Sequence, residues 1–153
     1  MSFTSVAART LIDTNILVYR YDWRFPDKQR IATGLLRDGI DDGTMRLPHQ
    51  AIVEFVAAAT RGAPGQQLLE PSEARREAEE FMAQFPVLYP DDAVLRTALR
   101  GMAAYRLSWF DAHLWAYAEV HGIPVLLSED FQNGRMYGTV TVRDPFAVQD
   151  TPI

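Results

Sequence analysis

The sequence contains no cysteine, one lysine and no long apolar run. Without cysteine the chain can form neither disulfides nor thiolate metal sites. No apolar run approaches the roughly 20 residues that a membrane-spanning helix needs. Residues 1–9 also lack the apolar core of a secretory signal. These absences favour a cytoplasmic protein without a membrane segment.

Basic residues are outnumbered, and the net charge is −5. Taken alone, this charge argues against non-specific binding to nucleic acid. Apart from Lys28 every basic residue is an arginine. The planar guanidinium fork suits phosphate, although ordinary surface charge explains most of these side chains. Part of the negative charge belongs to a candidate site described below, where bound cations would offset it.

The length of 153 residues suits one domain, and an apolar content of 48% with 23% charged residues is typical of a globular chain. Strand-like runs alternate with helical ones, which predicts an α/β domain with a mostly parallel sheet. The predicted strands lie at 9–13, 45–48, 87–89, 125–128 and 138–143, the last as a half-buried or edge strand. The predicted helices lie at 15–21, 26–38, 50–60, 72–85, 91–106 and 108–122, with a turn at 41–43. Ser72, Asp91 or Asp92, and Ser108 are the expected N-caps, and Gly122 follows a helix end.

Four acidic residues stand at the ends of predicted strands or within apolar helices. Asp13 ends the first strand, and Asp130 follows the strand at 125–128. Glu54 and Asp111 lie in strongly apolar helical segments, where a charge is costly unless it is solvated or paired. Carboxylates that lie together raise each other's pKa, and a hard divalent cation removes that conflict. The four therefore predict a metal site, whose obvious use is hydrolysis of a phosphodiester.

Each acid also has a purely structural interpretation. Asp13 can cap a helix that begins near Thr14, and Asp111 completes a capping-box pattern with Ser108. Asp130 can be a loop acid. Glu54 is harder to explain in this way, because its helix has only one narrow polar stripe, shared with Gln50.

Several nearby polar residues are secondary candidates: Asn15, Ser128 and Glu129. Glu129 is the weaker choice, because neighbouring residues in an extended segment point to opposite faces. His49, His113 and His121 have no metal-ligand spacing and are expected to be structural or exposed. The sequence contains no G-x-x-x-x-G-K-[ST], G-x-G-x-x-G or G-x-S-x-G motif.

In their order and spacing, the segments around the four acids resemble the PIN-domain ribonucleases, most of all the VapC-type toxins of bacterial toxin–antitoxin pairs. The matching segments are Leu11–Leu17, Ile52–Phe55, Leu107–Ala112, Leu127–Phe131 and Val140–Phe146. One departure is Phe110, where the family often has a smaller or different residue. The resemblance begins at Arg9, and residues 1–8 are expected to form a flexible N-terminal tail on a single domain over 1–153.

The resemblance implies a three-layer α/β/α fold, with a mostly parallel central sheet flanked by helices. It implies Mg²⁺ or Mn²⁺ held by Asp13, Glu54, Asp111 and Asp130, with Asn15 and Ser128 as polar helpers. It also implies endonucleolytic cleavage of RNA by a metal-activated water, inhibition by a small antitoxin protein, and a homodimer. Two alternatives stay open. One is a catalytically weak PIN-like module that binds RNA or protein, and the other is a different divalent-metal phosphohydrolase.

Overall fold

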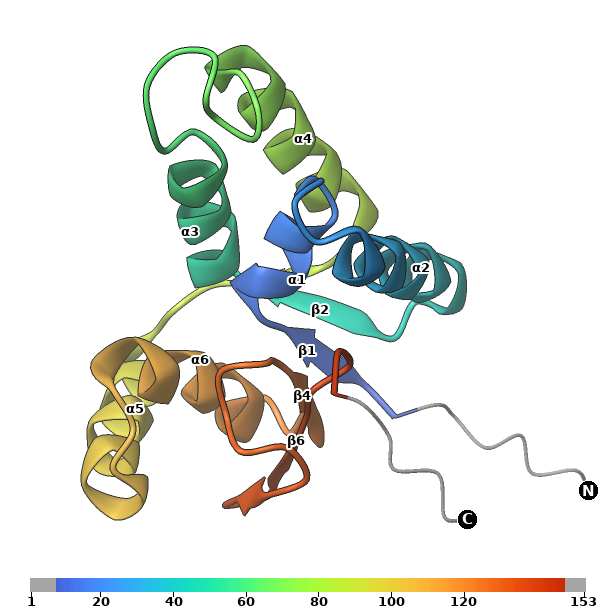
Figure 1. Ribbon diagram of the computed structural model, residues 1–153. Helices are drawn as coiled ribbons and strands as arrows, with labels where there is room; N and C mark the ends of the chain where they lie inside the picture. The colour runs from blue at the N-terminus through green and yellow to red at the C-terminus, as the bar shows by residue number, and fades with distance from the viewer. Residues whose placement is uncertain (1–7, 148–153) are drawn as a thin grey trace, which may run out of the picture.

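The computed structural model describes residues 8–147 and contains a six-stranded sheet with helices on both faces (Figure 1). The strands are β1 (Thr10–Ile12), β2 (Met45–Pro48), β3 (Val87–Leu88), β4 (Val125–Leu127), β5 (Met136–Tyr137) and β6 (Val140–Arg143). The helices are α1 (Thr14–Tyr19), α2 (Pro26–Asp42), α3 (His49–Ala59), α4 (Pro71–Gln84), α5 (Asp92–Tyr105) and α6 (Trp109–Val120). The strand order is β3-β2-β1-β4-β6-β5, and only β5 runs antiparallel to its neighbour.

Two separate apolar cores lie on the two faces of this sheet. Neighbouring residues of a strand point to opposite faces, and the central strands follow this rule. Leu11 and Leu126 pack with α5 and α6, whereas Ile12 and Leu127 pack with α1, α2, α3 and α4. Figure 1 shows the corresponding two groups of helices on either side of the strands. The predicted three-layer fold class is therefore confirmed.

The order of the strands creates a crevice at the carboxyl ends of β1 and β4. From β1, the chain first builds outward through β2 and β3, and later returns to the other side of β1 with β4. In open α/β sheets such a switch point is where ligands bind. Asp13 follows β1 directly and Ser128 follows β4 directly, so both stand at this crevice.

The helix boundaries differ from prediction at two places. α2 continues through Asp41 and Asp42, which were expected in a turn, and ends at Gly43 with a left-handed φ of 70°. Glycine adopts this conformation without a Cβ clash, so the helix stops there. α4 begins at Pro71 with Glu70 as its N-cap, so the expectation that Ser72 is the cap is wrong. Proline is well suited to the first helical position, which explains the earlier start.

The C-terminal strand is not at the edge of the sheet. β6 lies between β4 and the short strand β5, which the sequence analysis did not predict. Val140 and Val142 are buried and Thr141 is partly buried, as expected for a half-buried strand. The expected N-caps Asp91 and Ser108 are confirmed, since both accept a backbone N–H with their side chains. Residues 1–7 of the expected N-terminal tail lie outside the described residues.

No helix within residues 8–147 is long and apolar enough to cross a membrane.

Candidate metal centre

Asp13 is held by three hydrogen bonds at the junction of β1 and α1. Its side chain accepts from the Thr14 backbone N–H at 2.6 Å, so it does act as the helix cap. The other carboxylate oxygen accepts from the Ser128 hydroxyl at 2.5 Å and from the Asn15 amide at 3.3 Å. The residue is only 5% exposed. The structural and functional interpretations of Asp13 are thus compatible, because capping occupies only one of its oxygens.

Ser128 and Asn15 join Asp13 to Asp130 across the ends of β1 and β4. The Ser128 hydroxyl oxygen accepts the Asp130 backbone N–H at 3.0 Å, while donating its proton to Asp13. The Asn15 amide nitrogen donates to Asp13 and to Asp130, both at 3.3 Å. Both secondary candidates therefore contact the predicted acids and fix the position of one relative to the other.

Glu54 is oriented by hydrogen bonds from two different helices. Thr14 donates its hydroxyl proton to one carboxylate oxygen at 2.7 Å, and Gln50 donates its amide to the other at 3.0 Å. Gln50 also donates to the Phe110 backbone oxygen at 3.1 Å, next to Asp111. The polar stripe of α3 thus faces the start of α6 rather than open solvent.

The carboxylates act on one another through space. Burial raises the pKa of Asp13 to about 7, against the lowering effect of the Ser128 hydrogen bond, and the charges of Asp130 and Asp111 raise it as well. Burial also raises the pKa of Asp111, and the charges of Asp130 and Glu54 add to this. The pKa of Asp130 is raised by burial first and then by the charge of Glu129. Asp13, Asp111 and Asp130 therefore resist ionising together.

Glu129 has hydrogen-bond partners of its own, apart from these acids. It accepts from Lys28 at 2.8 Å and from the Tyr19 hydroxyl at 2.5 Å. The Lys28 ammonium also lies 4.8 Å from the centre of the Tyr19 ring. The charge of Glu129 is therefore paired, unlike the charges of the four candidate acids.

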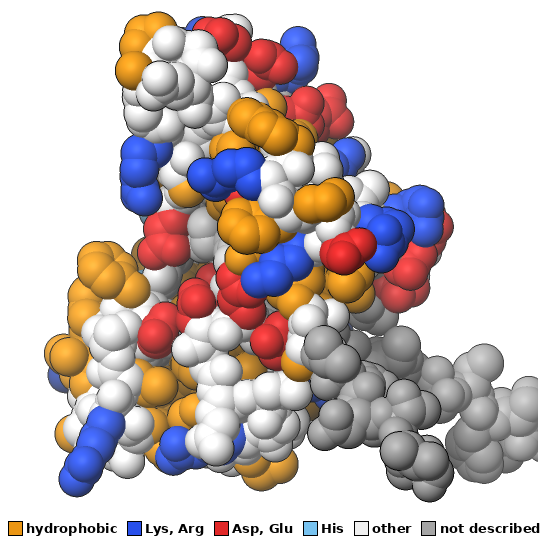
Figure 2. All heavy atoms as spheres, in the orientation of Figure 1, with side chains coloured by type: hydrophobic (Ala, Val, Ile, Leu, Met, Phe, Trp, Pro, Cys, Tyr) orange, Lys and Arg blue, Asp and Glu red, His pale blue; other side chains and the backbone are white. Residues whose placement is uncertain are grey.

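A cavity of about 350 Å³ opens at the acids. Asp13, Glu54 and Asp130 line it, whereas Asp111 does not, although the charge of Asp111 raises the pKa of Asp13 and the charges of Asp130 and Glu54 raise the pKa of Asp111. In Figure 2 acidic side chains gather in the central hollow of the visible face, between the two helical groups of Figure 1. Arg24, which no motif in the sequence marked, is the one basic residue lining the cavity, and it binds Asp22 through two nitrogens at 2.8 Å.

The donor set suits a hard cation, although its geometry is not that of a closed site. None of the four acids forms a salt bridge with a described basic residue. The Asn15 amide nitrogen donates to two acids, which fixes the orientation of the side chain. The Asn15 carbonyl oxygen is buried and has no hydrogen-bond partner among the described residues, so this oxygen is available as a further metal ligand. Yet within residues 8–147 no three acidic or histidine side chains already stand close enough to hold one ion. The residue types nevertheless suit Mg²⁺ or Mn²⁺, because both ions prefer oxygen ligands, and water would complete the coordination.

The sequence model of the PIN domain family matches residues 10–137. This chain belongs to the PIN domain family. The matched part of this PIN domain runs from β1 to β5 and contains all four candidate acids. No match was found among curated proteins.

Solved structures share the fold of this PIN domain. A toxin–antitoxin complex from Klebsiella pneumoniae is 16% identical with a TM-score of 0.65, covering 91% of this chain and 99% of the other. FitAcB from Neisseria gonorrhoeae is also 16% identical, with a TM-score of 0.68 and the same coverage. VapC20 of Mycobacterium tuberculosis, described as a sarcin-ricin loop cleaving toxin, is 13% identical with a TM-score of 0.56, covering 76% of this chain and 86% of the other. At such identities these likenesses establish the fold alone.

Proposed function

We propose that this PIN domain is a metal-dependent endoribonuclease and the toxin of a toxin–antitoxin pair. The observation that carries the proposal is the set of four unpaired acids at the switch point of the sheet, three of which have raised pKa values. The likeness to VapC20, which is described as cleaving the sarcin-ricin loop, favours RNA as the substrate.

The proposed division of roles follows the contacts. Asp13, Glu54, Asp111 and Asp130 would be the metal ligands, directly or through water. Ser128 and Asn15 would keep Asp13 and Asp130 in place, and Thr14 and Gln50 would do the same for Glu54. When bound, Mg²⁺ or Mn²⁺ supplies an activated water and positive charge beside the scissile phosphate.

The approach of the substrate phosphate would be aided by Arg24. Its guanidinium lies at the cavity of the acids and is 62% exposed, while Asp22 beneath it is nearly buried. Asp22 thus fixes the direction of a fork that can still offer donors to an incoming phosphate oxygen. Since Asp22 neutralises the charge of Arg24, the guanidinium would contribute hydrogen-bond donors to the phosphate rather than net positive charge.

The proposed partner is an antitoxin whose tail places an Arg or Lys among the four acids. Similar structures described as toxin–antitoxin complexes support this partner. In the stretch 55–59, Phe55 and Ala59 are buried in the core, whereas Ala58 lines the cavity of the acids. A neighbouring cavity, lined by Val18, Trp23 and Leu68, is the proposed place for the apolar side chains of the tail.

A cytoplasmic homodimer completes the proposal. Trp115 and Tyr117 cannot contribute to the dimer contact, because both are buried in the core. Trp23 and Phe25 are 59% and 45% exposed and remain available. Sedimentation that gives only monomer at micromolar concentration would remove the dimer without affecting the nuclease.

The decisive experiment is cleavage of single-stranded RNA by the purified chain, with added Mg²⁺ or Mn²⁺ and with chelator. We expect cleavage that depends on the metal and no hydrolysis of small phosphoesters. RNA binding without cleavage would favour a binding module instead. Hydrolysis of small phosphoesters would favour a different phosphohydrolase.

A further inference from the structure

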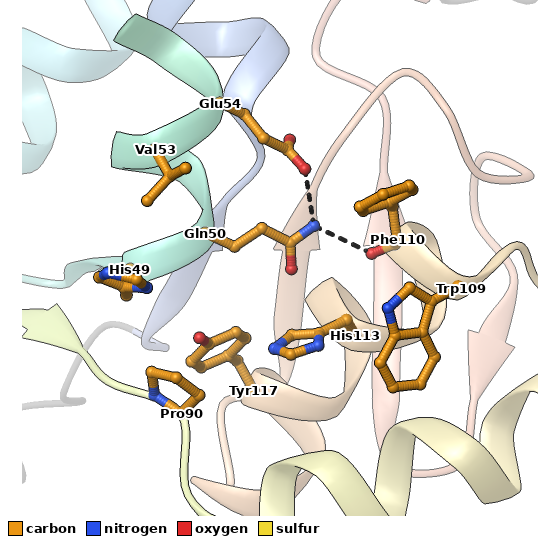
Figure 3. Close-up of a pocket in the computed structure, with 9 residues that line it drawn as sticks. All are labelled: His49, Gln50, Val53, Glu54, Pro90, Trp109, Phe110, His113 and Tyr117. Carbon is orange, nitrogen blue, oxygen red and sulfur yellow. Dashed lines mark hydrogen bonds between the residues drawn. The ribbon is translucent and has the colours of Figure 1, made fainter. Parts of the chain in front are cut away.

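A different cavity, of about 360 Å³, lies on the other side of Glu54 from the acids. It lies between the start of α3 and the start of α6, and Figure 3 shows the side chains around it. Its volume falls within the roughly 300–1,000 Å³ that is typical of small-molecule sites. Glu54 lines both cavities, so a molecule that fills this one lies next to the proposed phosphate position.

The Gln50 side chain presents a hydrogen-bond acceptor to this cavity. Its amide nitrogen donates to the Glu54 carboxylate and to the Phe110 backbone oxygen, and both of these groups are acceptors. The amide therefore cannot flip, because its oxygen would then face two other oxygens. The Gln50 carbonyl oxygen is buried without a partner and points toward Tyr117 and His113 in Figure 3.

The Tyr117 hydroxyl presents a hydrogen-bond donor to the same cavity. Burial raises the pKa of Tyr117 to about 12, although the nearby Gln50 backbone N–H acts in the opposite direction. The hydroxyl therefore keeps its proton at neutral pH. Tyr117 is fully buried, and no hydrogen-bond partner for its hydroxyl exists in the part of the chain that the structure describes.

Aromatic rings form the walls around these two polar atoms. The rings of Trp109 and His113 meet edge to face with centres 5.6 Å apart, and His113 lies 5.3 Å from the Tyr117 ring. Phe110 stands at the cavity with 66% of its surface exposed. Because the two polar atoms are covered, a ligand must shift a neighbouring side chain to reach them, and the exposed Phe110 ring can then stack on the bound ligand.

We propose that this cavity binds an unpaired nucleobase of the RNA substrate. Aromatic rings provide stacking surfaces for any base, and the edge of every base offers both donors and acceptors to a neighbouring donor–acceptor pair. Here Gln50 supplies the acceptor and Tyr117 the donor. The inference rests on the proposed function, since it assigns the nucleotide beside the cleaved phosphate to a site next to Glu54.

The test uses the metal-free full-length chain and neutral probes, so that the acids and the phosphate play no part. Adenosine, guanosine, cytidine and uridine are titrated against ribose, which has no base, while the Trp109 indole and Gln50 amide signals are followed by NMR. We expect at least one nucleoside to bind about tenfold more tightly than ribose, which corresponds to about 1.4 kcal/mol. The Phe110→Ala and Tyr117→Phe variants should each lose most of that difference.

Leu99→Ala is the matched control, because Leu99 is 58% exposed on α5 and lies outside the cavity. It should bind nucleosides like the parent. Equal binding of ribose and all four nucleosides would overturn the proposal, as would unchanged binding in folded Phe110→Ala and Tyr117→Phe proteins. Metal-dependent cleavage of RNA by the parent is measured separately. The nuclease can therefore stand while the base site fails, and nucleoside binding without cleavage would remove only the nuclease.

Discussion

The two cavities beside Glu54 share helix α3 but differ in their other walls, α1 for one and α6 for the other, and in their polar chemistry. On one side, Asp13 and Asp130 are crowded carboxylates whose charges oppose one another. On the other side, the Gln50 carbonyl oxygen and the Tyr117 hydroxyl are neutral groups without a hydrogen-bond partner among the described residues. The first cavity gains from a cation, whereas the second gains from a neutral molecule with its own donors and acceptors. This difference separates binding of the phosphate from binding of the base in the proposed substrate complex.

The largest effect is expected from Asp13→Asn. Asparagine caps a helix about as well as aspartate, so the bond to the Thr14 N–H can persist. The substitution removes the charge of a proposed metal ligand and with it several kcal/mol of transition-state stabilisation. The rate of RNA cleavage should therefore fall about a thousandfold. Initial rates at saturating Mn²⁺ measure it. Asp91→Asn, at the cap of α5, is the control and should cleave like the parent.

A parent-like rate in Asp13→Asn would mean that Asp13 serves only as a helix cap. The acidic cavity would then lose its role as the catalytic site.

The second largest effect is expected in the pH dependence of the free energy of unfolding, measured in the presence of chelator. The pKa of Asp13 is raised from 3.8 to about 7 on folding, so between these values the folded chain keeps a proton that the unfolded chain has released. Stability should therefore fall as pH rises from about 4 to about 7 and level off above. At about 1.4 kcal/mol per pKa unit, the free energy of unfolding should fall by at most about 4 kcal/mol over this range.

Urea unfolding at each pH measures this dependence, and Asp13→Asn should flatten much of it. The remaining slope belongs to Asp111 and Asp130, whose pKa values are also raised. A parent whose stability rises over this range would show that Asp13 ionises readily. The predicted crowding of charge would then be wrong.

The fold was easier to predict than the contacts within it. Asp13 ends an apolar run and Ser108 precedes an apolar helix, and such local patterns were enough to place strand ends and caps. The two-residue strand β5 has too few residues for any periodicity to mark it. The Asn15 bridge between Asp13 and Asp130 spans 115 residues, so no local pattern carries it. In the sequence, Tyr117 is indistinguishable from a core aromatic. Its hydroxyl without a partner and its place at the cavity between α3 and α6 are visible only in the structure.

Ser128→Ala tests how far the acids depend on their supports. The hydroxyl bonds Asp13 and the Asp130 backbone at once, so its loss should loosen both. Removing such an outer partner of a metal ligand typically costs about 10–100-fold in metal affinity. Titration of the folded variant with Mn²⁺ measures this, and Ser72→Ala, which removes an exposed hydroxyl of α4 that does not line the cavity of the acids, is the control. Unchanged Mn²⁺ affinity in Ser128→Ala would place the metal away from Asp13.

The smallest effect on stability is expected from Tyr117→Phe, which, like Ser128→Ala, removes a single hydroxyl oxygen. The Ser128 hydroxyl has two partners, whereas the Tyr117 hydroxyl has none and is buried. Losing a bonded hydroxyl leaves its partners unsatisfied at a cost of about 1–3 kcal/mol, but losing an unpaired one leaves nothing unsatisfied. Ser128→Ala should therefore lower the free energy of unfolding, while Tyr117→Phe should leave it unchanged or raise it by up to about 1 kcal/mol. Urea unfolding of both variants at one pH makes the comparison. A clear loss of stability in Tyr117→Phe would mean that the hydroxyl is already satisfied in the free protein, and a base would then gain nothing from it.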